Sequence, residues 1–436
     1  MLETNCANRP DDLDVALLPK IDLHTGYHPT LINTPPAGHR LQPANADHVF
    51  LFPEQVGFPH ECFHVGEFVE VEGNDDLVHA ARWPVLGAGA WVVDTDDLLY
   101  PVLCGRAAID AGWRAKLRDR ADKDFLAQLE RRVTNMLTAY VHPSCAAILL
   151  WGHPRDSITA AADWFASLNC HRLGDAFLEK VVPIRPARAA CDPSLVSAKW
   201  ADQQALRVVF CGRDFDCKNG LMALRVMQRV RAVVPAIECV FIGPVPDAIK
   251  QQQPELLDGI SHRSSISHDE CVEIISRAHV LFHPSKYESM GLVFIEAMAA
   301  GVAALTARGD RMDYVDELFA SGGAILVDRD EVPAEAEEAA FEQGLLSLAM
   351  NFQLAKEMGL RNYSLVAHGE YAISERDKVL TRVYESARAG RCSPLTLDDL
   401  PHVRREGVLR LPSSKVQADE LRYRSMHADC ALNVYI

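Results

Sequence analysis

The second half of the chain alternates between short apolar runs and longer segments with helical periodicity, and this pattern restricts the possible fold most. Residues 206–211 and 238–243 are near-continuous apolar runs, and residues 220–234 between them carry apolar side chains at helical spacing before Pro235. The pattern continues with strand-like runs at 279–283, 302–306 and 324–327 and helix-like segments at 247–257, 271–278 and 291–300. Short apolar strands that alternate with helices predict βαβ units, with helices covering both faces of a parallel sheet.

The first half shows the same alternation less regularly. Its strand-like runs are residues 48–52, 65–71, 90–94, 146–151 and 180–184, and its helix-like segments are 113–140 and 155–168. We therefore predict an α/β fold with parallel sheets along the chain. Residues 185–204 contain two prolines and no clear period, which predicts an interdomain linker, and the acidic residues 328–342 predict a solvated helix start.

The acidic composition argues against several classes of function. The 436 residues include 44 Lys and Arg against 60 Asp and Glu, a formal net charge of −16. Broad binding to nucleic acid or to an anionic membrane requires a positive field, so neither is expected. The basic stretch 113–120 is followed by further aspartates, which favours a solvated helix face over a lipid-headgroup contact.

Targeting signals and metal-binding patterns are not found in the sequence. Apolar runs such as residues 145–151 are far shorter than the ~20 residues that span a bilayer. The N-terminus has no basic region followed by an apolar core, so no secretory signal is expected. The twelve cysteines form no CxxC pair and are expected to be buried small side chains in a reducing cytoplasm, without a structural metal.

A first candidate motif, residues 211–220, lies directly between a predicted strand and a predicted helix. It reads Cys-Gly-Arg-Asp-Phe-Asp-Cys-Lys-Asn-Gly. Gly212 permits a sharp turn, and the start of the following helix favours an anion. Arg213 and Lys218 add two positive charges, a combination that suits a diphosphate. An ordinary turn with two solvated basic side chains is the alternative.

A second motif, residues 284–301, contains two glutamates eight positions apart, with Gly291 opening a helix between them. Glu288 follows a predicted strand, at the sheet edge where open α/β sheets bind ligands. Glu296 lies inside the helix among apolar residues, where an unpaired carboxylate is costly. Two hydroxyls of a ribose are suitable partners for it, and a nearby Arg or Lys is the alternative.

These motifs resemble those of family 4 glycosyltransferases, the retaining enzymes of the GT-B fold. Glu288 and Glu296 reproduce that family's E-x7-E motif, and residues 212–220 resemble its G-R-x4-K-x-G donor-phosphate loop. The resemblance covers about residues 206–328. It implies two Rossmann-like domains whose parallel sheets face a central cleft.

The resemblance also implies a division of the chain. We expect an acceptor-binding domain at residues 1–200 and a nucleotide-sugar-binding domain at residues 201–370. Residues 371–436 would form a crossover helix and a tail that return to the N-terminal domain.

Carried over by motif, the donor site takes most of its residues from the second half. Arg213 and Lys218 would hold the diphosphate, Glu296 the ribose hydroxyls, and Glu288 the donor sugar. The remaining donor-site residues are the turn glycine Gly212, the base-facing His262 and Arg263, and the backbone at Ser289, Met290, Gly291 and Leu292.

The N-terminal half matches the family less well. Residues 76–98 include D-L-V-H-A and V-V-D-T-D-D-L, which resemble the family's D-x-V-H … V-V-x-T-x-H-D stretch. In that alignment Asp96 stands where the family has a strand-end histidine facing the sugar. This difference indicates another donor sugar, or a role for another residue such as His64. Helix capping is the alternative for Asp96 and its neighbours Asp94 and Asp97.

The implied activity is transfer of a hexose-type sugar from a nucleoside-diphosphate sugar to an acceptor, with retention of anomeric configuration. The catalytic residues would be Arg213, Lys218, Glu288 and Asp96. The positive charges of Arg213 and Lys218 would take the place of a metal ion, so no metal or other cofactor is expected. A non-catalytic relative that acts as a binding or scaffolding subunit, and a nucleotide-sugar epimerase, are the alternatives. The acceptor is not specified by the sequence.

Overall fold

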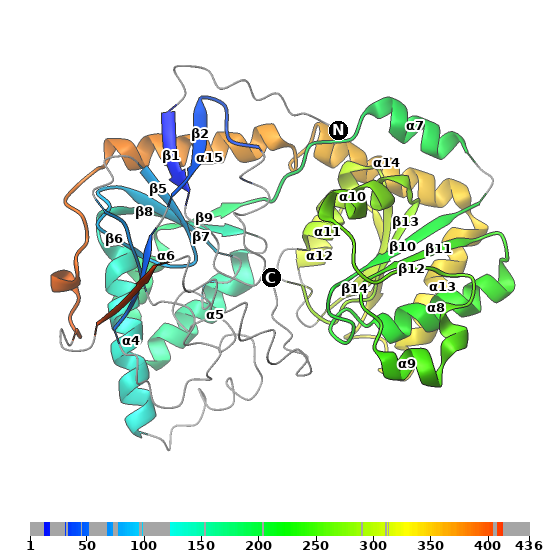
Figure 1. Ribbon diagram of the computed structural model, residues 1–436, viewed down its shortest axis with the longest axis horizontal. Helices are drawn as coiled ribbons and strands as arrows, with labels where there is room; N and C mark the ends of the chain where they lie inside the picture. Colours follow the sequence, from blue (N-terminus) through cyan, green and yellow to red (C-terminus); the bar gives the residue numbers. More distant parts are fainter. Residues whose placement is uncertain are drawn as a thin grey trace. The chain divides into compact units, whose positions relative to one another are not determined.

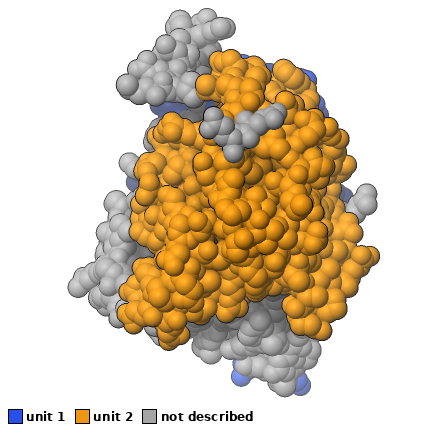
Figure 2. Space-filling view, turned by 90° about the vertical axis from the view of Figure 1, so that its right-hand side faces the viewer, with its two compact units in different colours: residues 1–184, 376–436 blue, residues 185–375 orange. Residues whose placement is uncertain are grey.

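The computed structural model describes residues 13–17, 31, 34–44, 46–51, 68–72, 77–95, 98, 123–151, 154–202, 205–288, 291–309, 312, 314–403 and 408–412. The chain divides into two compact units, coloured separately in Figure 2. Unit 1 is Met1–Ile184 together with Arg376–Ile436, and unit 2 is Arg185–Glu375. Unit 2 therefore starts before residue 201 and ends after residue 370, the bounds expected from the sequence.

Unit 2 is built on a six-stranded parallel sheet (Figure 1). Its strands are β10 (Arg207–Cys211), β11 (Glu238–Ile242), β12 (Ser261–Arg263), β13 (Val280–His283), β14 (Ala303–Arg308) and β15 (Ala324–Asp328). The order across the sheet is β12-β11-β10-β13-β14-β15, and each neighbouring pair is parallel. The chain thus runs outward in both directions from β10 and β13. The carboxyl ends of these two strands flank the point where strand order reverses, which is where open α/β sheets bind ligands.

Helices cover both faces of this sheet, as the apolar strands predict. They are α8 (Gly220–Val233), α9 (Asp247–Gln252), the 3-10 helix η3 (Pro254–Leu257), α10 (His268–Arg277), α11 (Leu292–Ala299), α12 (Tyr314–Leu318), α13 (Glu337–Met350) and α14 (Phe352–Ala367). Phe210 packs on one face with residues of α8 and α13. Val209, the next residue along β10, packs on the other face with residues of α10 and α11. The acidic segment 328–342, which predicts a helix start, contains the first residue of α13, Glu337.

The predicted interdomain linker contains a helix of unit 2, so this part of the prediction is wrong. α7 (Pro193–Ala201) begins after Asp192, whose carboxylate accepts a hydrogen bond from the Ser194 N–H at 2.7 Å. Trp200 is buried, and its Nε1 donates to the Gly301 carbonyl at 2.9 Å. The helix is short, and only two of its three buried side chains, Val196 and Trp200, are apolar, so its helical period is weak in the sequence.

Unit 1 contains a second six-stranded parallel sheet, with the order β2-β1-β5-β7-β8-β9. Its strands are β1 (Leu13–Leu17), β2 (His39–Pro43), β5 (Leu77–Ala81), β7 (Trp91–Thr95), β8 (Cys145–Trp151) and β9 (Val181–Ile184). The helices are α4 (Lys123–Val141), α5 (Pro154–Ser167), α6 (His171–Leu178) and α15 (Ile373–Ala389), with the 3-10 helix η4 (Leu397–Asp399).

The two faces of this sheet have different partners. Val78 and Val93 belong to the core that includes α4, α5 and α6. His79, which lies between Val78 and Ala80 on β5, points to the opposite face, where its Nδ1 lies 2.7 Å from the Tyr384 hydroxyl of α15. The C-terminal helix α15 therefore covers the face of the sheet that α4, α5 and α6 leave open.

Two strands expected in the parallel sheet belong to a separate four-stranded sheet of unit 1. These are β3 (Asp47–Phe50) and β4 (Phe68–Glu70), which pair antiparallel in the order β16-β3-β4-β6. The other members are β6 (Val85–Leu86), parallel to β4, and β16 (Leu409–Pro412), antiparallel to β3. The prediction is wrong here because a run of four or five apolar residues does not reveal the direction of its partner strand.

Among the helices in these described ranges, none has the length and the apolar composition that crossing a membrane requires.

Candidate functional site

The loop after β10 is a tight turn at the switch point of the unit 2 sheet. Asp214 orders it twice: its carboxylate accepts from the Cys217 N–H at 2.9 Å, and its carbonyl accepts from the Lys218 N–H at 2.9 Å. Glycine is needed at Gly212, because a methyl group there would lie 2.7 Å from Cγ of Lys218. The turn therefore places Lys218 back over the start of the loop, while Arg213 is exposed to solvent.

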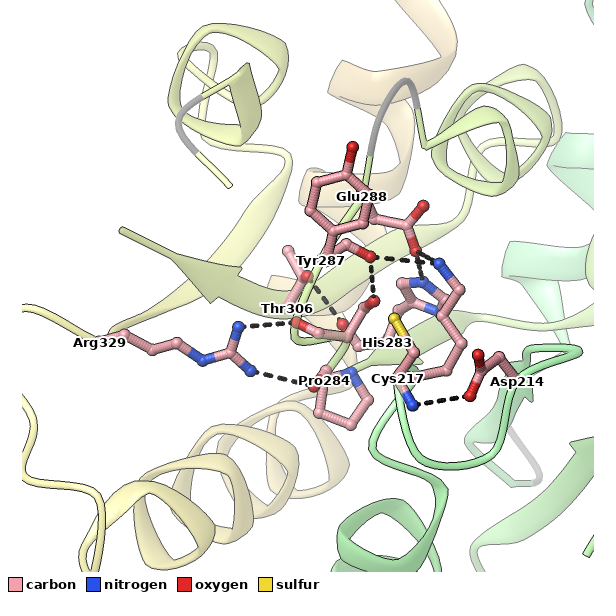
Figure 3. Close-up of polar contacts among 10 residues, drawn as sticks. Asp214, Cys217, His283, Pro284, Tyr287, Glu288, Thr306 and Arg329 are labelled. Atoms are coloured by element: carbon pink, nitrogen blue, oxygen red, sulfur yellow. Dashed lines mark hydrogen bonds and ion pairs between the residues drawn. The ribbon is translucent and has the colours of Figure 1, made fainter. Parts of the chain in front are cut away.

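Lys218 and Glu288 form the centre of the candidate site. Lys218 Nζ lies 2.5 Å from Glu288 Oε1 and 3.2 Å from the Tyr287 carbonyl (Figure 3). His283, the last residue of β13, places its Nε2 2.6 Å from the same carboxylate oxygen. The structure therefore brings together one residue from each sequence motif, Lys218 and Glu288, and adds His283, which was not predicted.

The Glu288 carboxyl group is ionised at neutral pH although it is buried. Only 8% of its side chain is exposed. Burial raises its pKa, but the Lys218 charge and the His283 hydrogen bond outweigh burial and lower the pKa to about 2. An ionised carboxylate accepts hydrogen bonds only, so this group is suited to hydroxyl donors of a ligand.

Three hydrogen bonds, from two parts of unit 2, fix the loop that carries Glu288. Thr306 Oγ1 on β14 donates to the His283 carbonyl at 2.8 Å. Arg329, just beyond β15, donates to the carbonyls of Pro284 and Ser285 at 3.1 and 2.7 Å (Figure 3). Because neighbouring strands hold its carbonyls, the loop after β13 presents Glu288 in a defined position.

Gly291 and Leu292 lie at the start of α11, as predicted. Gly291 is the N-cap residue, with a φ of 54°, and gives the helix no side-chain cap. The first N–H groups of a helix lack intrahelical partners, so this end of α11 can receive an anion. Ser289 and Met290 lie outside the described residues.

Glu296 is part of an ion pair elsewhere on the same face of unit 2. Its Oε1 lies 2.6 Å from Arg188 Nη2 and 2.9 Å from His268 Nε2, and 9% of its side chain is exposed. The hydrogen bond that His268 makes to the Glu296 carboxylate raises the pKa of His268 above its usual value. The Arg partner that was the alternative to ribose is therefore present. Arg188 carried no signal in the sequence, because it lies in the segment expected to be a linker.

His262 and Arg263 lie on the edge strand β12. His262 Nε2 lies 2.9 Å from the Gly243 carbonyl, and the Gly243 N–H donates to the Arg263 carbonyl at 2.8 Å. Gly243 has a φ of 141°, and a side chain on it would overlap the Gly212 carbonyl. These contacts tie the end of β12 to the loop that carries Lys218, while the Arg263 side chain is exposed.

Two cysteines next to the site depart from the expectation of buried, inert thiols. Cys211, at the end of β10, and Cys271, on α10, are both half-buried, and their Sγ atoms lie 3.3 Å apart. They are sixty residues apart in the sequence, so their spacing does not predict that the two thiols lie close together.

In unit 1 the strand-end motif forms a buried polar cluster. Asp94, on β7, is 2% exposed, and its Oδ2 lies 3.4 Å from His79 Nε2. The other ring nitrogen of His79 contacts the Tyr384 hydroxyl. The predicted catalytic residue Asp96 lies outside the described residues, as do Asp97 and His64.

No group of three or more His, Cys, Asp or Glu side chains is arranged to hold a metal ion within the part of the chain that the structure describes.

Comparison with known proteins identifies the type of domain in unit 2. Residues 197–339 match the sequence family "Glycosyl transferases group 1". The gpi3 subunit of phosphatidylinositol N-acetylglucosaminyltransferase from Schizosaccharomyces pombe (strain 972 / ATCC 24843) is 27% identical over 136 residues. That match covers 29% of this chain and 30% of the relative. Most of unit 2 is therefore a glycosyl transferases group 1 domain.

Similarity to solved structures extends over about seven-tenths of the chain. WaaG, a glycosyltransferase involved in lipopolysaccharide biosynthesis, is 15% identical, with a TM-score of 0.50 over 71% of this chain and 78% of that one. Sucrose-phosphate synthase from Thermosynechococcus elongatus is 15% identical, with a TM-score of 0.46 over 72% and 74% of the two chains. With the two parallel sheets, the likeness to WaaG shows an α/β fold of GT-B type with two Rossmann-like domains.

Proposed function

We propose that this protein is a retaining glycosyltransferase that takes a sugar from a nucleoside-diphosphate sugar bound to unit 2. The observation that carries the proposal is the Lys218–Glu288 pair, at 2.5 Å. It lies at the switch point of the parallel sheet, beside the uncapped start of α11. It also lies inside the segment that matches the glycosyl transferases group 1 family.

The chemistry of these groups suits a departing diphosphate. When the bond between the sugar and the phosphate breaks, negative charge grows on the leaving phosphate. Fixed positive charges and N–H dipoles lower the barrier most when they are already in place. Lys218 is held by Glu288 and by the Tyr287 carbonyl, so its ammonium group is positioned before the ligand binds. Arg213 on the same turn is exposed and supplies the second charge.

The carboxylates are suited to the two sugars of the donor. Ionised Glu288 accepts hydrogen bonds from hydroxyls of the transferred sugar, and Glu296 accepts them from the ribose. Arg188 and His268 hold Glu296 in place in the free protein. His262 and Arg263, at the end of β12, would face the base.

Several finer points of the proposal come from the resemblance to family 4 glycosyltransferases. These are retention, the transfer of a hexose-type sugar, the part played by Asp96 and metal independence. The proposed cytoplasmic location rests instead on the cysteine usage. Retention is tested by proton NMR of the freshly formed product, in which the anomeric coupling must match that of the donor. The named activity of the S. pombe relative makes N-acetylglucosamine the first sugar to test.

A thermal-shift panel of nucleotide sugars tests the proposal. A ligand that binds only the folded state raises the melting temperature. At a hundredfold excess over its Kd, it adds about 2.7 kcal/mol to the free energy of unfolding. We expect one nucleotide sugar and its nucleoside diphosphate to stabilise the protein, and the matching nucleoside to have little effect. If no member of the panel stabilises the protein, the proposal is wrong. Stabilisation without transfer or hydrolysis supports a binding subunit instead.

A further inference from the structure

The side chain of Tyr314 is buried, and its hydroxyl group is unpaired among the residues that the structure describes. Tyr314 is the first residue of α12, is 8% exposed, and its hydroxyl has no hydrogen-bond partner within that part of the chain. Leaving a buried hydroxyl unpaired costs free energy of folding. Other buried tyrosines of the chain avoid this cost: Tyr140 donates to the Arg82 carbonyl at 2.7 Å, and Tyr384 contacts His79. The unpaired hydroxyl of Tyr314 therefore calls for a partner from outside the chain.

The hydroxyl lies at the start of α11. A side chain on Gly291, the N-cap residue, would overlap the Tyr314 hydroxyl oxygen. The N–H groups of the first helical turn point toward the same end. Leu292 and Val293, which begin the helix, are only half-buried, so this end of α11 is partly open to solvent. One phenol hydroxyl and the first N–H groups of α11 thus converge on one place.

Charges around the hydroxyl keep it a hydrogen-bond donor. Burial raises the pKa of Tyr314, and the neighbouring Glu288 carboxylate raises it further. The phenol therefore keeps its proton at any ordinary pH. A protonated hydroxyl beside the positive end of a helix is a site for an oxyanion.

We infer that the Tyr314 hydroxyl and the start of α11 bind one phosphate oxygen of the donor's diphosphate, with the hydroxyl donating the hydrogen bond. The inference rests on the proposed function and names a residue that neither sequence motif contains. It also explains why an unpaired buried hydroxyl is kept in the free protein.

Tyr314→Phe tests this inference, because it removes only the hydroxyl. Its free form should be at least as thermally stable as the wild type, since no hydrogen bond is lost. A hydrogen bond to a charged group is worth about 1.5–3 kcal/mol, so affinity should fall by about tenfold or more. Calorimetric titrations use UDP, GDP and ADP, the matching monophosphates, and the nucleotide sugar that binds best. The loss should be equal for the nucleoside diphosphate and its sugar conjugate.

Tyr363→Phe is the matched control in the same unit. The Tyr363 hydroxyl donates to the Cys191 carbonyl at 2.8 Å. This variant should lower the melting temperature and leave affinity unchanged.

The outcomes separate the inference from the proposed function. If the wild type binds none of these nucleotides, both are wrong. If the wild type binds and Tyr314→Phe binds equally well, only the role of Tyr314 is wrong. A loss confined to the nucleotide sugar, or a lower melting temperature of free Tyr314→Phe, also overturns the phosphate contact.

Discussion

Glu288 is buried but carries a negative charge at neutral pH, and loss of this charge in acid is expected to destabilise the folded protein. Its pKa is about 2 in the folded protein, against an ordinary value of 4.5. Because the folded-state pKa is depressed, the resulting stabilisation is fully present above about pH 4.5 and is lost as the pH falls toward 2. A shift of this size corresponds to about 3 kcal/mol, as an order of magnitude.

Glu288→Gln should therefore lower stability at neutral pH and matter less in acid. The amide keeps the size of the carboxyl group but leaves the Lys218 ammonium without its counter-charge. Differential scanning calorimetry at pH 7 and pH 3 measures the effect, and the difference from the wild type should shrink by about half or more at pH 3. Glu255→Gln, at an exposed position on η3, is the control with little effect at either pH. An equal difference at both pH values would contradict the charged pair.

The contact between Glu296 and His268 can be tested by substituting the second carboxylate of the site. Its hydrogen bond raises the pKa of His268, so Glu296→Gln should bring that pKa back down toward 6.5, measured by NMR titration of the imidazole. The same variant should weaken nucleotide-sugar binding, because a neutral amide is a poorer acceptor for ribose hydroxyls. A His268 pKa that stays as high as in the wild type, together with unchanged donor affinity, would rule out both roles.

At the scale of elements, the loop after β13 depends on Arg329. This side chain donates to the Pro284 and Ser285 carbonyls and pairs with Glu337 at 2.8 Å, with 16% of its surface exposed. Arg329→Ala should lower the melting temperature of unit 2 by on the order of 5 °C, because buried carbonyls lose charged donors. It should also weaken donor binding, because the loop carries Glu288.

Arg308→Ala is the comparison for this loop. Arg308 is 39% exposed and pairs with Asp316 and Asp328 near the surface, where ion pairs contribute little. We expect a small change in melting temperature and none in affinity. If Arg308→Ala and Arg329→Ala behave alike, Arg329 does not position the loop.

Most strands of unit 2 and the helices between them were predictable because their signals are local, whereas α7, α12 and α14 were not predicted. Apolar runs such as β11 and β13 are continuous, and α8 carries its own period and stops before Pro235. Partners far apart in the chain were not predictable. Arg188 reaches Glu296 only because the segment before α7 folds onto unit 2, and no pattern within that segment shows this. In unit 1, the strands β1, β2, β5, β6 and β16 and the helix α6 were not predicted.

At the scale of the whole molecule, the GT-B fold followed from two short motifs and their resemblance to a family. Those motifs lie in unit 2, and the Lys218–Glu288 contact joins them. The site residues of unit 1 were harder to predict, because the strand-end motif of unit 1 departs from the family pattern. Of that motif, Asp94 is buried against His79, whereas Asp96 lies outside the described residues. The role of Asp96 therefore stays a prediction.

Metal independence is a property of the whole reaction and is directly testable. Arg213 and Lys218 are proposed to balance the charge of the diphosphate, so transfer should continue in excess EDTA. The assay follows release of the nucleoside diphosphate with and without the chelator. Loss of activity that magnesium or manganese restores would show that a metal shares this task.

The most direct test of the central claim is the turnover of Lys218→Ala at saturating donor, measured as nucleoside diphosphate released per enzyme molecule per second. Removing one preorganised charge typically costs a factor of ~100 or more in kcat, and we predict a loss of that size. Lys250→Ala, a surface lysine paired with Asp247 on α9, should keep full turnover. Near-wild-type turnover of Lys218→Ala, or no release of diphosphate by the wild type with any nucleotide sugar, would contradict the account.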